Sequence, residues 1–279
     1  MKRRRFIYYT ATGLLASGIT SEVKAQTNVR KPKVSTAETV KPQNKPGEGL
    51  LIQWLGHTCF LLTGGGQRVL VNPFRAIGCT AGYKLPQVEA DLVLISSQLW
   101  DEGAAENLPG NPKVLFEPGV YEIGNFKLQG ISMFHDRVGG KRFGINVAWK
   151  WTQAGISIVH LGGAAAPVEL EQKILLGSPD VAFIPVGGGP KAYSPEEAKQ
   201  AMGILSPKIM IPTQFLTGAA DKAKCDLVPV DNFLKLAQGM NIKSIDGDKL
   251  LVKKQDLPSK GTLIRVFSDK GLLKEGDDR

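Results

Sequence analysis

The side chains best suited to bind a metal ion or to move a proton are few and widely spaced along this chain. The three histidines and three cysteines are His57, His135, His160, Cys59, Cys79 and Cys225. No CxxC pair and no cluster of cysteines with histidines occurs, so the ligand spacing of a structural zinc site is absent. Three cysteines cannot all pair within one chain, and Cys59 lies in an apolar run that suits a small buried side chain.

One polar segment combines several reactive residue types directly after an apolar stretch. Residues 91–95 form a nearly continuous aliphatic run, which is typical of a strand buried on both faces. The loop that follows holds Ser97, Asp101 and Glu102, which are able to serve as nucleophile, base or metal ligand. The serine is flanked by Ser96 and Gln98, which do not form the GxSxG turn of an esterase nucleophile.

The elements that must position these side chains are short strands, with helices between the later ones. Strands are predicted at residues 50–55, 59–63, 68–72, 91–95, 114–117, 126–132, 146–151, 156–160, 180–185 and 208–212. One helix is predicted to begin after Ser194, a good N-cap residue that precedes Pro195 at the first helical position. A second helix is predicted from Asp231 to Gly239. Two β-rich halves with helices outside indicate an α/β protein built as an αββα sandwich of four layers.

Seven segments in order resemble the metallo-β-lactamase fold, in its branch of ascorbate-6-phosphate-lactonase-like hydrolases. The segments that carry the resemblance are residues 54–60, 70–74, 91–102, 134–135, 159–163, 180–188 and 207–215. The resemblance spans roughly residues 50–220 and implies a hydrolase in which one or two metal ions activate a water molecule. Fold alone does not carry function, so the individual ligand positions have to be compared.

Most positions that the resemblance assigns to metal ligands hold other residues in this chain. At the ligand positions of the family's HxHxDH motif, this chain has Ser97, Leu99, Asp101 and Glu102. Gly163 stands where the family has a bridging Asp, and Gln214 stands where it has a last His. Asn72 also replaces an aspartate of the family, and only Asp101 and His135 clearly remain as ligand types. Because leucine and glycine side chains offer no lone pair, we expect no metal and no confident catalytic residue.

The resemblance also places a pocket beside these positions. It implies a lining that includes His57, Trp100, Asp101, His135 and Gln214. For His57, contact with a ligand and a purely structural role remain equally open, whereas His160 is predicted to be structural. The Trp100 side chain either stacks against a ligand or fills the space left by the missing imidazoles. Without a metal, Asp101 is expected to bind loop amides and Glu102 to face solvent.

Three functions remain open. The first is an inactive pseudo-hydrolase that serves as a ligand-binding or scaffold protein, with no cofactor. The second is a metal-dependent hydrolase of a lactone, ester or phosphorylated compound, with one zinc or other divalent ion on Asp101, His135 and possibly Glu102, and with Gln214 as a weak fourth ligand. A metal-free hydrolase using Ser97, His135 and Asp101 would need close contacts and an oxyanion hole. The third function is a partner-binding module that uses a basic linker.

The first 25 residues are predicted to be an export signal of the twin-arginine type. Residues 3–7 read Arg-Arg-Arg-Phe-Ile, and a short, mildly apolar stretch leads to small residues at 23–25. An ordinary secretory signal is the alternative. Such a stretch is too short for a membrane span, so no transmembrane anchor is expected after its removal. The expected destination is the periplasm, or a thylakoid lumen if the source is photosynthetic, for a chain that does not depend on disulfides.

The remaining organisation follows from composition. Residues 26–48 are predicted to be a flexible basic linker, residues 49–270 the folded domain, and residues 271–279 a charged tail. Of the formal net charge of +9, only +2 belongs to residues beyond the linker. A nucleic-acid-binding domain carries its charge on the folded surface, so this distribution argues against nucleic acid as a partner. The small-molecule or protein partner is not identified by the sequence.

Overall fold

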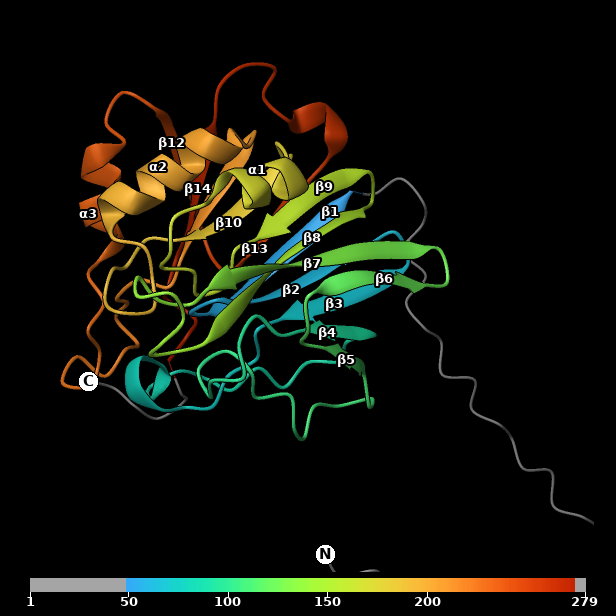
Figure 1. Cartoon of the computed structure of the whole chain (residues 1–279), viewed down its shortest axis with the longest axis horizontal. Helices are drawn as coiled ribbons and strands as arrows, with labels where there is room; N and C mark the ends of the chain where they lie inside the picture. Colours follow the sequence, from blue (N-terminus) through green and yellow to red (C-terminus); the bar gives the residue numbers. More distant parts are fainter. Residues whose placement is uncertain (1–48, 274–279) are drawn as a thin grey trace, which may run out of the picture. The chain divides into compact units, whose positions relative to one another are not determined.

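The computed structural model describes residues 49–273, which form two β-sheets and three α-helices (Figure 1). Contacts divide the chain into residues 1–41 and 42–279, and every described residue belongs to the second unit. The predicted signal at residues 1–25 and linker at residues 26–48 lie outside the described residues. Within residues 49–273, none of the helices has the length and apolar character needed to cross a membrane.

The smaller sheet has six strands in the order β13-β1-β2-β3-β4-β5. Their bounds are β1 Leu50–Gly56, β2 Cys59–Gly64, β3 Gln67–Val71, β4 Leu92–Leu94, β5 Lys113–Leu115 and β13 Lys249–Val252. The pairs among β13, β1, β2 and β3 are antiparallel, and β3, β4 and β5 run parallel. Burial alternates along β1, whereas all three residues of β4 are buried, as its aliphatic run predicts.

The larger sheet has eight strands in the order β12-β14-β11-β10-β9-β8-β7-β6. Their bounds are β6 Gly119–Ile123, β7 Phe126–Phe134, β8 Ile145–Gln153, β9 Ile156–His160, β10 Val181–Pro185, β11 Ile209–Thr213, β12 Asn241–Ile245 and β14 Leu263–Phe267. Strands β6 to β9 form an antiparallel meander, and β9, β10, β11, β14 and β12 run parallel. Every residue of β10 and β11 is buried, so both faces of the sheet are covered there.

The helices cover the outer face of the larger sheet. They are α1 Leu170–Leu176, α2 Pro195–Leu205 and α3 Val230–Leu236, and α1 contacts β7 while α2 contacts both β10 and α3. As predicted, Ser194 caps α2: its Oγ accepts a hydrogen bond from the Glu197 amide at 3.2 Å, and the Glu197 carboxylate accepts from the Ser194 amide at 2.7 Å. Helix α3 begins before the predicted cap at Asp231 and ends before Gly239, and α1 was not predicted.

The core lies between the two sheets and is rich in aromatic side chains. Phe60 of the smaller sheet packs against Phe183 and Phe267 of the larger one, with ring centroids 4.6 and 5.9 Å apart. This arrangement confirms the predicted sandwich fold class. Among the described residues the outer face of the smaller sheet carries no α-helix, and alternate residues of β1 there are half-buried. Part of the predicted tail packs on the domain, because Leu272 is buried and Leu273 pairs with Tyr83.

Five strands of the two sheets end near one site. Strands β3 and β4 of the smaller sheet, and β9, β10 and β11 of the larger sheet, lead into loops at their carboxyl ends. Loops that connect parallel strands to the next element commonly supply ligand-binding residues at this edge. The loops after β4, β9 and β11 carry the residues that the resemblance assigns to the metal site, so the fold brings these positions together.

Candidate functional site: a buried carboxylate among former ligand positions

The carboxylate of Glu102 lies at the centre of the site. Its Oε2 accepts a hydrogen bond from Ser97 Oγ at 2.9 Å and lies 3.1 Å from His135 Nε2. Its Oε1 accepts a hydrogen bond from Gln214 Nε2 at 3.3 Å. Glu102 and His135 are both fully buried. Four of the ligand positions assigned by the resemblance therefore meet in one cluster around a side-chain carboxylate.

Gly163 provides the space that this carboxylate needs. A Cβ atom at position 163 would lie 2.1 Å from Glu102 Oε1 and 2.8 Å from His135 Cε1, which is closer than non-bonded atoms approach. The backbone amide of Gly163 is held by Asn146, whose Oδ1 accepts its hydrogen bond at 3.1 Å. An aspartate at this position is therefore incompatible with the present place of Glu102.

The charge state of the cluster follows from the pairing of Glu102 with His135. Burial raises the pKa of Glu102, but the charge of His135 and its hydrogen bond outweigh burial and hold that pKa at about 2. Burial lowers the pKa of His135, but Glu102 outweighs this effect and raises the pKa above its ordinary value. Each group thus favours the charged form of the other, and because a carboxylate only accepts, His135 Nε2 is the donor of the hydrogen bond between them.

One expectation about this loop is therefore wrong, and one alternative lacks the contacts that it needs. Glu102 was expected to face solvent, but its side chain is buried because His135, 33 residues away in sequence, supplies the opposite charge. Ser97, His135 and Asp101 do not form a catalytic triad, because the Ser97 hydroxyl donates to Glu102 and not to the imidazole. The cluster thus lacks the serine-to-histidine contact that nucleophilic catalysis requires.

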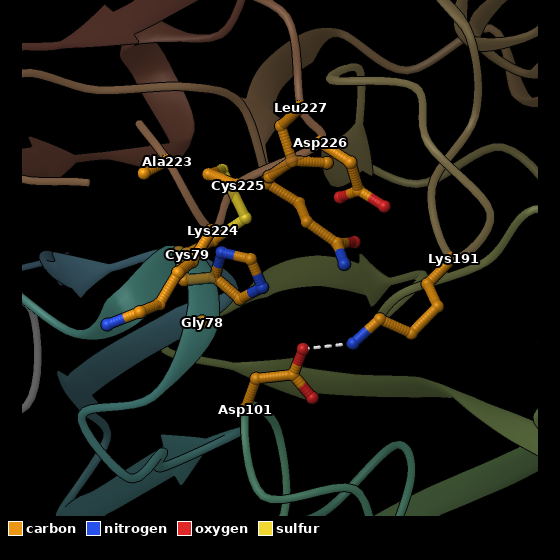
Figure 2. A pocket seen from close by; sticks show the side chains of 11 residues that line it. Gly78, Cys79, Asp101, Lys191, Ala223, Lys224, Cys225, Asp226 and Leu227 are labelled. Carbon is orange, nitrogen blue, oxygen red and sulfur yellow. Dashed lines mark hydrogen bonds and ion pairs between the residues drawn. A yellow bond between two sulfur atoms is a disulfide. The ribbon is translucent and has the colours of Figure 1, made fainter. Parts of the chain in front are cut away.

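Asp101 lies apart from the cluster. Its carboxylate forms an ion pair with Lys191 and not with the loop amides that were expected (Figure 2). Within residues 49–273 no group of three or more His, Cys, Asp or Glu side chains is close enough to hold a metal ion. The predicted mononuclear set of Asp101, His135 and Glu102 is therefore not assembled. The residues at the centre do not fit a zinc ion, because the carboxylate of Glu102 occupies the place where ligands converge.

A cavity of about 410 Å³ opens beside the cluster. It is lined by His57, Gly78, Cys79, Asp101, Lys191, Gln214, Ala223, Lys224, Cys225, Asp226 and Leu227. Of the predicted pocket residues, His57, Asp101 and Gln214 line this cavity. His135 is fully buried and does not line it.

Trp100 lies outside that cavity and does not fill the metal site. Its side chain is 59 % exposed, and the Arg75 guanidinium lies 5.0 Å from its ring centroid. Trp100 instead lines a neighbouring cavity of about 360 Å³. The other residues of that cavity are Ile77, Gly78, Gln98, Leu99, Asp101, Phe143 and Lys191.

His57 combines a structural backbone with an unpartnered ring. Its carbonyl oxygen accepts hydrogen bonds from Trp54 Nε1 at 3.2 Å and from the Gln214 amide at 3.3 Å, which ties the β1–β2 turn to the loop after β11. Both ring nitrogens are buried and have no hydrogen-bond partner among the described residues. Burial lowers the pKa of His57, so its ring is neutral near pH 7. The ring lines the cavity and offers one donor and one acceptor to a ligand.

His160 is satisfied within the fold. Its Nε2 donates to the Thr58 carbonyl at 3.1 Å, and its Nδ1 accepts from the Gly162 amide at 3.0 Å. Burial lowers the pKa of His160 to about 4, so the ring stays neutral. These two hydrogen bonds agree with the structural role predicted for it. Asn72 is also structural, since its Oδ1 accepts a hydrogen bond from the Ser96 amide at 2.8 Å.

A disulfide joins two loops at the wall of the larger cavity (Figure 2). It links Cys79 to Cys225, which are 146 positions apart in sequence, and leaves Cys59 as the buried free cysteine. The expectation of a chain that does not depend on disulfides is therefore wrong. No local pattern signals this pair, because only the folded chain brings the two loops together.

We expect the double substitution Cys79→Ser/Cys225→Ser to destabilise the protein by about 2–4 kcal/mol, because the cross-link restricts a long loop in the unfolded chain. Urea denaturation of the oxidised wild type and of the variant measures this difference. Cys59→Ser serves as the matched control for changing a thiol. Titration of the unfolded, unreduced wild type should find one free thiol per chain, and three free thiols would contradict the pairing.

Sequence reasoning missed the residues that position Lys191. The Arg137 guanidinium binds the Glu197 carboxylate at 2.7 Å and donates to the carbonyls of Gly189 at 2.9 Å and Ala192 at 2.8 Å. Because Gly189 and Ala192 flank Lys191, these hydrogen bonds hold the glycine-rich loop after β10 in place on both sides of it. The run of three glycines at 187–189 indicated a turn, but nothing in it identified Arg137 as its partner.

Comparisons with known proteins agree with this architecture. Residues 51–214 match the family described as the Beta-lactamase superfamily domain. The chain belongs to this superfamily. The UPF0173 metal-dependent hydrolase of Thermococcus onnurineus is 27% identical over an alignment of 191 residues, and the match covers 60% of this chain and 84% of the relative. The UPF0173 metal-dependent hydrolase of Pelotomaculum thermopropionicum is 27% identical over 195 residues, with the same two coverages.

A solved structure extends the beta-lactamase superfamily match over more of the chain. A Thermotoga maritima protein of the metallo-beta-lactamase superfamily superimposes with a TM-score of 0.64 and 29% sequence identity. The alignment covers 78% of this chain and 99% of that protein. The predicted superfamily is confirmed, and the chain is a hydrolase-like member of it.

Proposed function

We propose that this protein is an exported member of the beta-lactamase superfamily that no longer catalyses metal-dependent hydrolysis and instead binds a small molecule in the cavity beside His57. The observation that carries this proposal is the position of the Glu102 carboxylate among the former ligand positions. Each of its three polar neighbours donates a hydrogen bond to it. A zinc ligand must instead direct a lone pair at the ion.

The chemistry of the donors supports the loss of hydrolysis. A catalytic zinc site keeps three protein ligands and an open position for water. Here His135 Nε2 carries a proton toward Glu102, Gln214 presents its amide NH₂, and Gly163 has no side chain.

The alternative is a metal-dependent hydrolase, and the printed names of the relatives favour it. It would require Glu102 to turn away from the three groups that donate hydrogen bonds to it. A single divalent ion would then be held by Asp101, His135 and Glu102.

Metal content separates the two functions. We expect well below one zinc per chain when the protein is purified without chelators and dialysed against zinc, because the cluster offers donors where an ion needs acceptors. Elemental analysis measures the ratio, and the Thermococcus onnurineus relative purified in parallel is the positive control. One zinc or more per chain, with ester or lactone hydrolysis that His135→Ala abolishes, would establish the alternative.

Export is the second part of the proposal. The motif at residues 3–7 and the disulfide support it, since stable disulfides are typical of oxidising compartments. We expect Arg3→Lys/Arg4→Lys to retain the protein in the cytoplasm, because the twin-arginine route reads the paired guanidinium groups. Cell fractionation measures this, with Lys24→Arg as the control substitution in the same segment. Unchanged export of the Arg3/Arg4 variant would point to the ordinary secretory route.

A further inference from the structure

The two cavities of the site are neighbours with a common wall. Gly78, Asp101 and Lys191 line both of them. Figure 2 shows Asp101 and Lys191 meeting across the larger cavity through their ion pair. Exposed and partly exposed ion pairs contribute little to stability, so this pair can rearrange at small cost. One ligand can therefore contact both cavities.

The larger cavity carries charges of both signs. Its charged residues are Asp101, Lys191, Lys224 and Asp226. Lys224 also pairs with Asp221 at 3.0 Å, whereas no hydrogen bond from the described residues reaches the carboxylate of Asp226. The ammonium of Lys191 has three donors and uses one on Asp101. The cavity thus offers acceptors for an ammonium group beside a donor for a carboxylate.

Two buried polar side chains in this cavity lack partners. Gln214 is 1 % exposed, and its amide orientation is determined by the Glu102 carboxylate, which can only accept from Nε2. Its Oε1 therefore has no hydrogen bond among the described residues and requires a donor. His57 is 2 % exposed, and both of its ring nitrogens lack a partner. Both side chains border the cavity, but these three polar atoms have almost no accessible surface, so a ligand contacts them only after a side chain moves.

The smaller cavity is mostly apolar, with Gln98 and the shared ion pair as its polar lining residues. Leu99, Trp100 and Phe143 contribute to its wall, and Trp100 is largely exposed. Aromatic side chains with an exposed face are typical of surfaces that bind apolar groups. Its volume of about 360 Å³ lies at the lower end of the range for small-molecule sites.

We propose that the two cavities bind one zwitterionic small molecule with an apolar substituent, a free α-amino acid such as leucine or phenylalanine. The ammonium group binds Asp226 and Asp101. The carboxylate binds Lys191, and the apolar side chain packs on Trp100 and Leu99. This assignment rests on the proposed function, since it requires a metal-free cavity that binds and does not hydrolyse.

Calorimetric titration of the purified full chain with four probes tests the three parts of the ligand. L-Phenylalanine has all three parts, N-acetyl-L-phenylalanine lacks the ammonium group, phenethylamine lacks the carboxylate, and L-alanine lacks the apolar side chain. We expect L-phenylalanine to bind and each analogue to bind at least about tenfold more weakly, since each loses a charge-assisted or apolar contact. No binding of L-phenylalanine or L-leucine, or equal binding of the analogues, would overturn the assignment.

Variants of the shared wall provide the second test. Lys191→Met and Trp100→Ala should each weaken L-phenylalanine binding about tenfold or more. Lys222→Met is the matched control, because Lys222 is exposed and lines neither cavity. Circular dichroism confirms that each variant is folded. Wild-type affinity in both Lys191→Met and Trp100→Ala would overturn the proposal.

Tryptophan fluorescence gives an independent readout. The other tryptophans, Trp54, Trp149 and Trp151, are no more than 3 % exposed, so acrylamide quenching reports on Trp100. L-Phenylalanine should protect Trp100 from the quencher, and unchanged quenching at saturation would place the ligand elsewhere. A metal-free protein that binds none of the amino acids would refute this assignment alone. Stoichiometric zinc would refute the proposed function as well.

Discussion

Replacing Gly163 by aspartate is expected to destabilise the domain by more than about 4 kcal/mol. Few single substitutions lower the free energy of unfolding by this much. The new Cβ would lie 2.1 Å from Glu102 Oε1, so either the loop or the buried carboxylate must move. Overpacking a rigid core costs about 1–3 kcal/mol on its own. The aspartate also places a second carboxylate beside Glu102 with no basic partner, which adds the cost of an unpaired buried charge.

A double-mutant cycle shows whether Glu102 is the cause. In the Glu102→Ala background the 2.1 Å contact disappears and the 2.8 Å approach to His135 Cε1 remains, so Gly163→Asp should cost less there than in the wild type. Gly203→Ala is the control, because a Cβ at position 203 in α2 meets nothing within 4 Å. It should be neutral or slightly stabilising. Equal costs for Gly163→Asp in both backgrounds, measured by urea denaturation, would show that Glu102 does not fill this space.

The fold was predictable because its signals are local or depend on order along the chain. The aliphatic run that becomes β4, the capped start of α2 and the order of the seven family-like segments each need only neighbouring residues. The short helix α1 was missed because its first and middle residues, Leu170 and Ile174, are about 70 % exposed and produce no buried stripe.

The site was predictable as a set of positions but not as a structure. Substitution at Ser97, Gly163 and Gln214 was visible in the sequence, whereas the inward turn of Glu102 was not. A glutamate beside a loop is expected at the surface, because charged side chains are rarely buried without a partner. Its partner His135 follows β7 on the other sheet, and the gap at Gly163 follows β9. Only the three-dimensional arrangement reveals that these features are complementary.

The same reasoning explains the misplaced pocket residues. His135 was assigned to the cavity lining but is fully buried and does not line it, since its ring is engaged by Glu102. Trp100 was assigned to the same cavity, but its ring lies under Arg75 and beside the apolar cavity. The loop between β4 and β5 thus directs Asp101 and Glu102 to different places, although they are adjacent in sequence.

Replacing Glu102 by alanine is expected to destabilise the domain by about 3–5 kcal/mol, the usual cost of removing one partner of a buried ion pair. The variant leaves the imidazole of His135, the hydroxyl of Ser97 and the amide of Gln214 without their common acceptor. Glu102→Gln is the matched control, because it retains the volume and one acceptor oxygen while removing the charge. It should cost less than the alanine variant.

The loss of stability in Glu102→Ala should depend on pH, and the pKa shifts of Glu102 and His135 determine how. The pKa of Glu102 is lowered from 4.5 to about 2, so its contribution is present above pH 4.5 and is lost as the pH falls toward 2. The pKa of His135 is raised from 6.5, so its contribution is present below pH 6.5 and is lost as the pH rises through the raised value. The difference between wild type and Glu102→Ala should therefore be largest between pH 4.5 and 6.5. Denaturation midpoints measured from pH 4 to pH 9 test this window. A difference that stays constant across that range would mean that Glu102 acts through packing and not as the charged partner of His135, since only an ion pair loses its strength when one member changes its protonation.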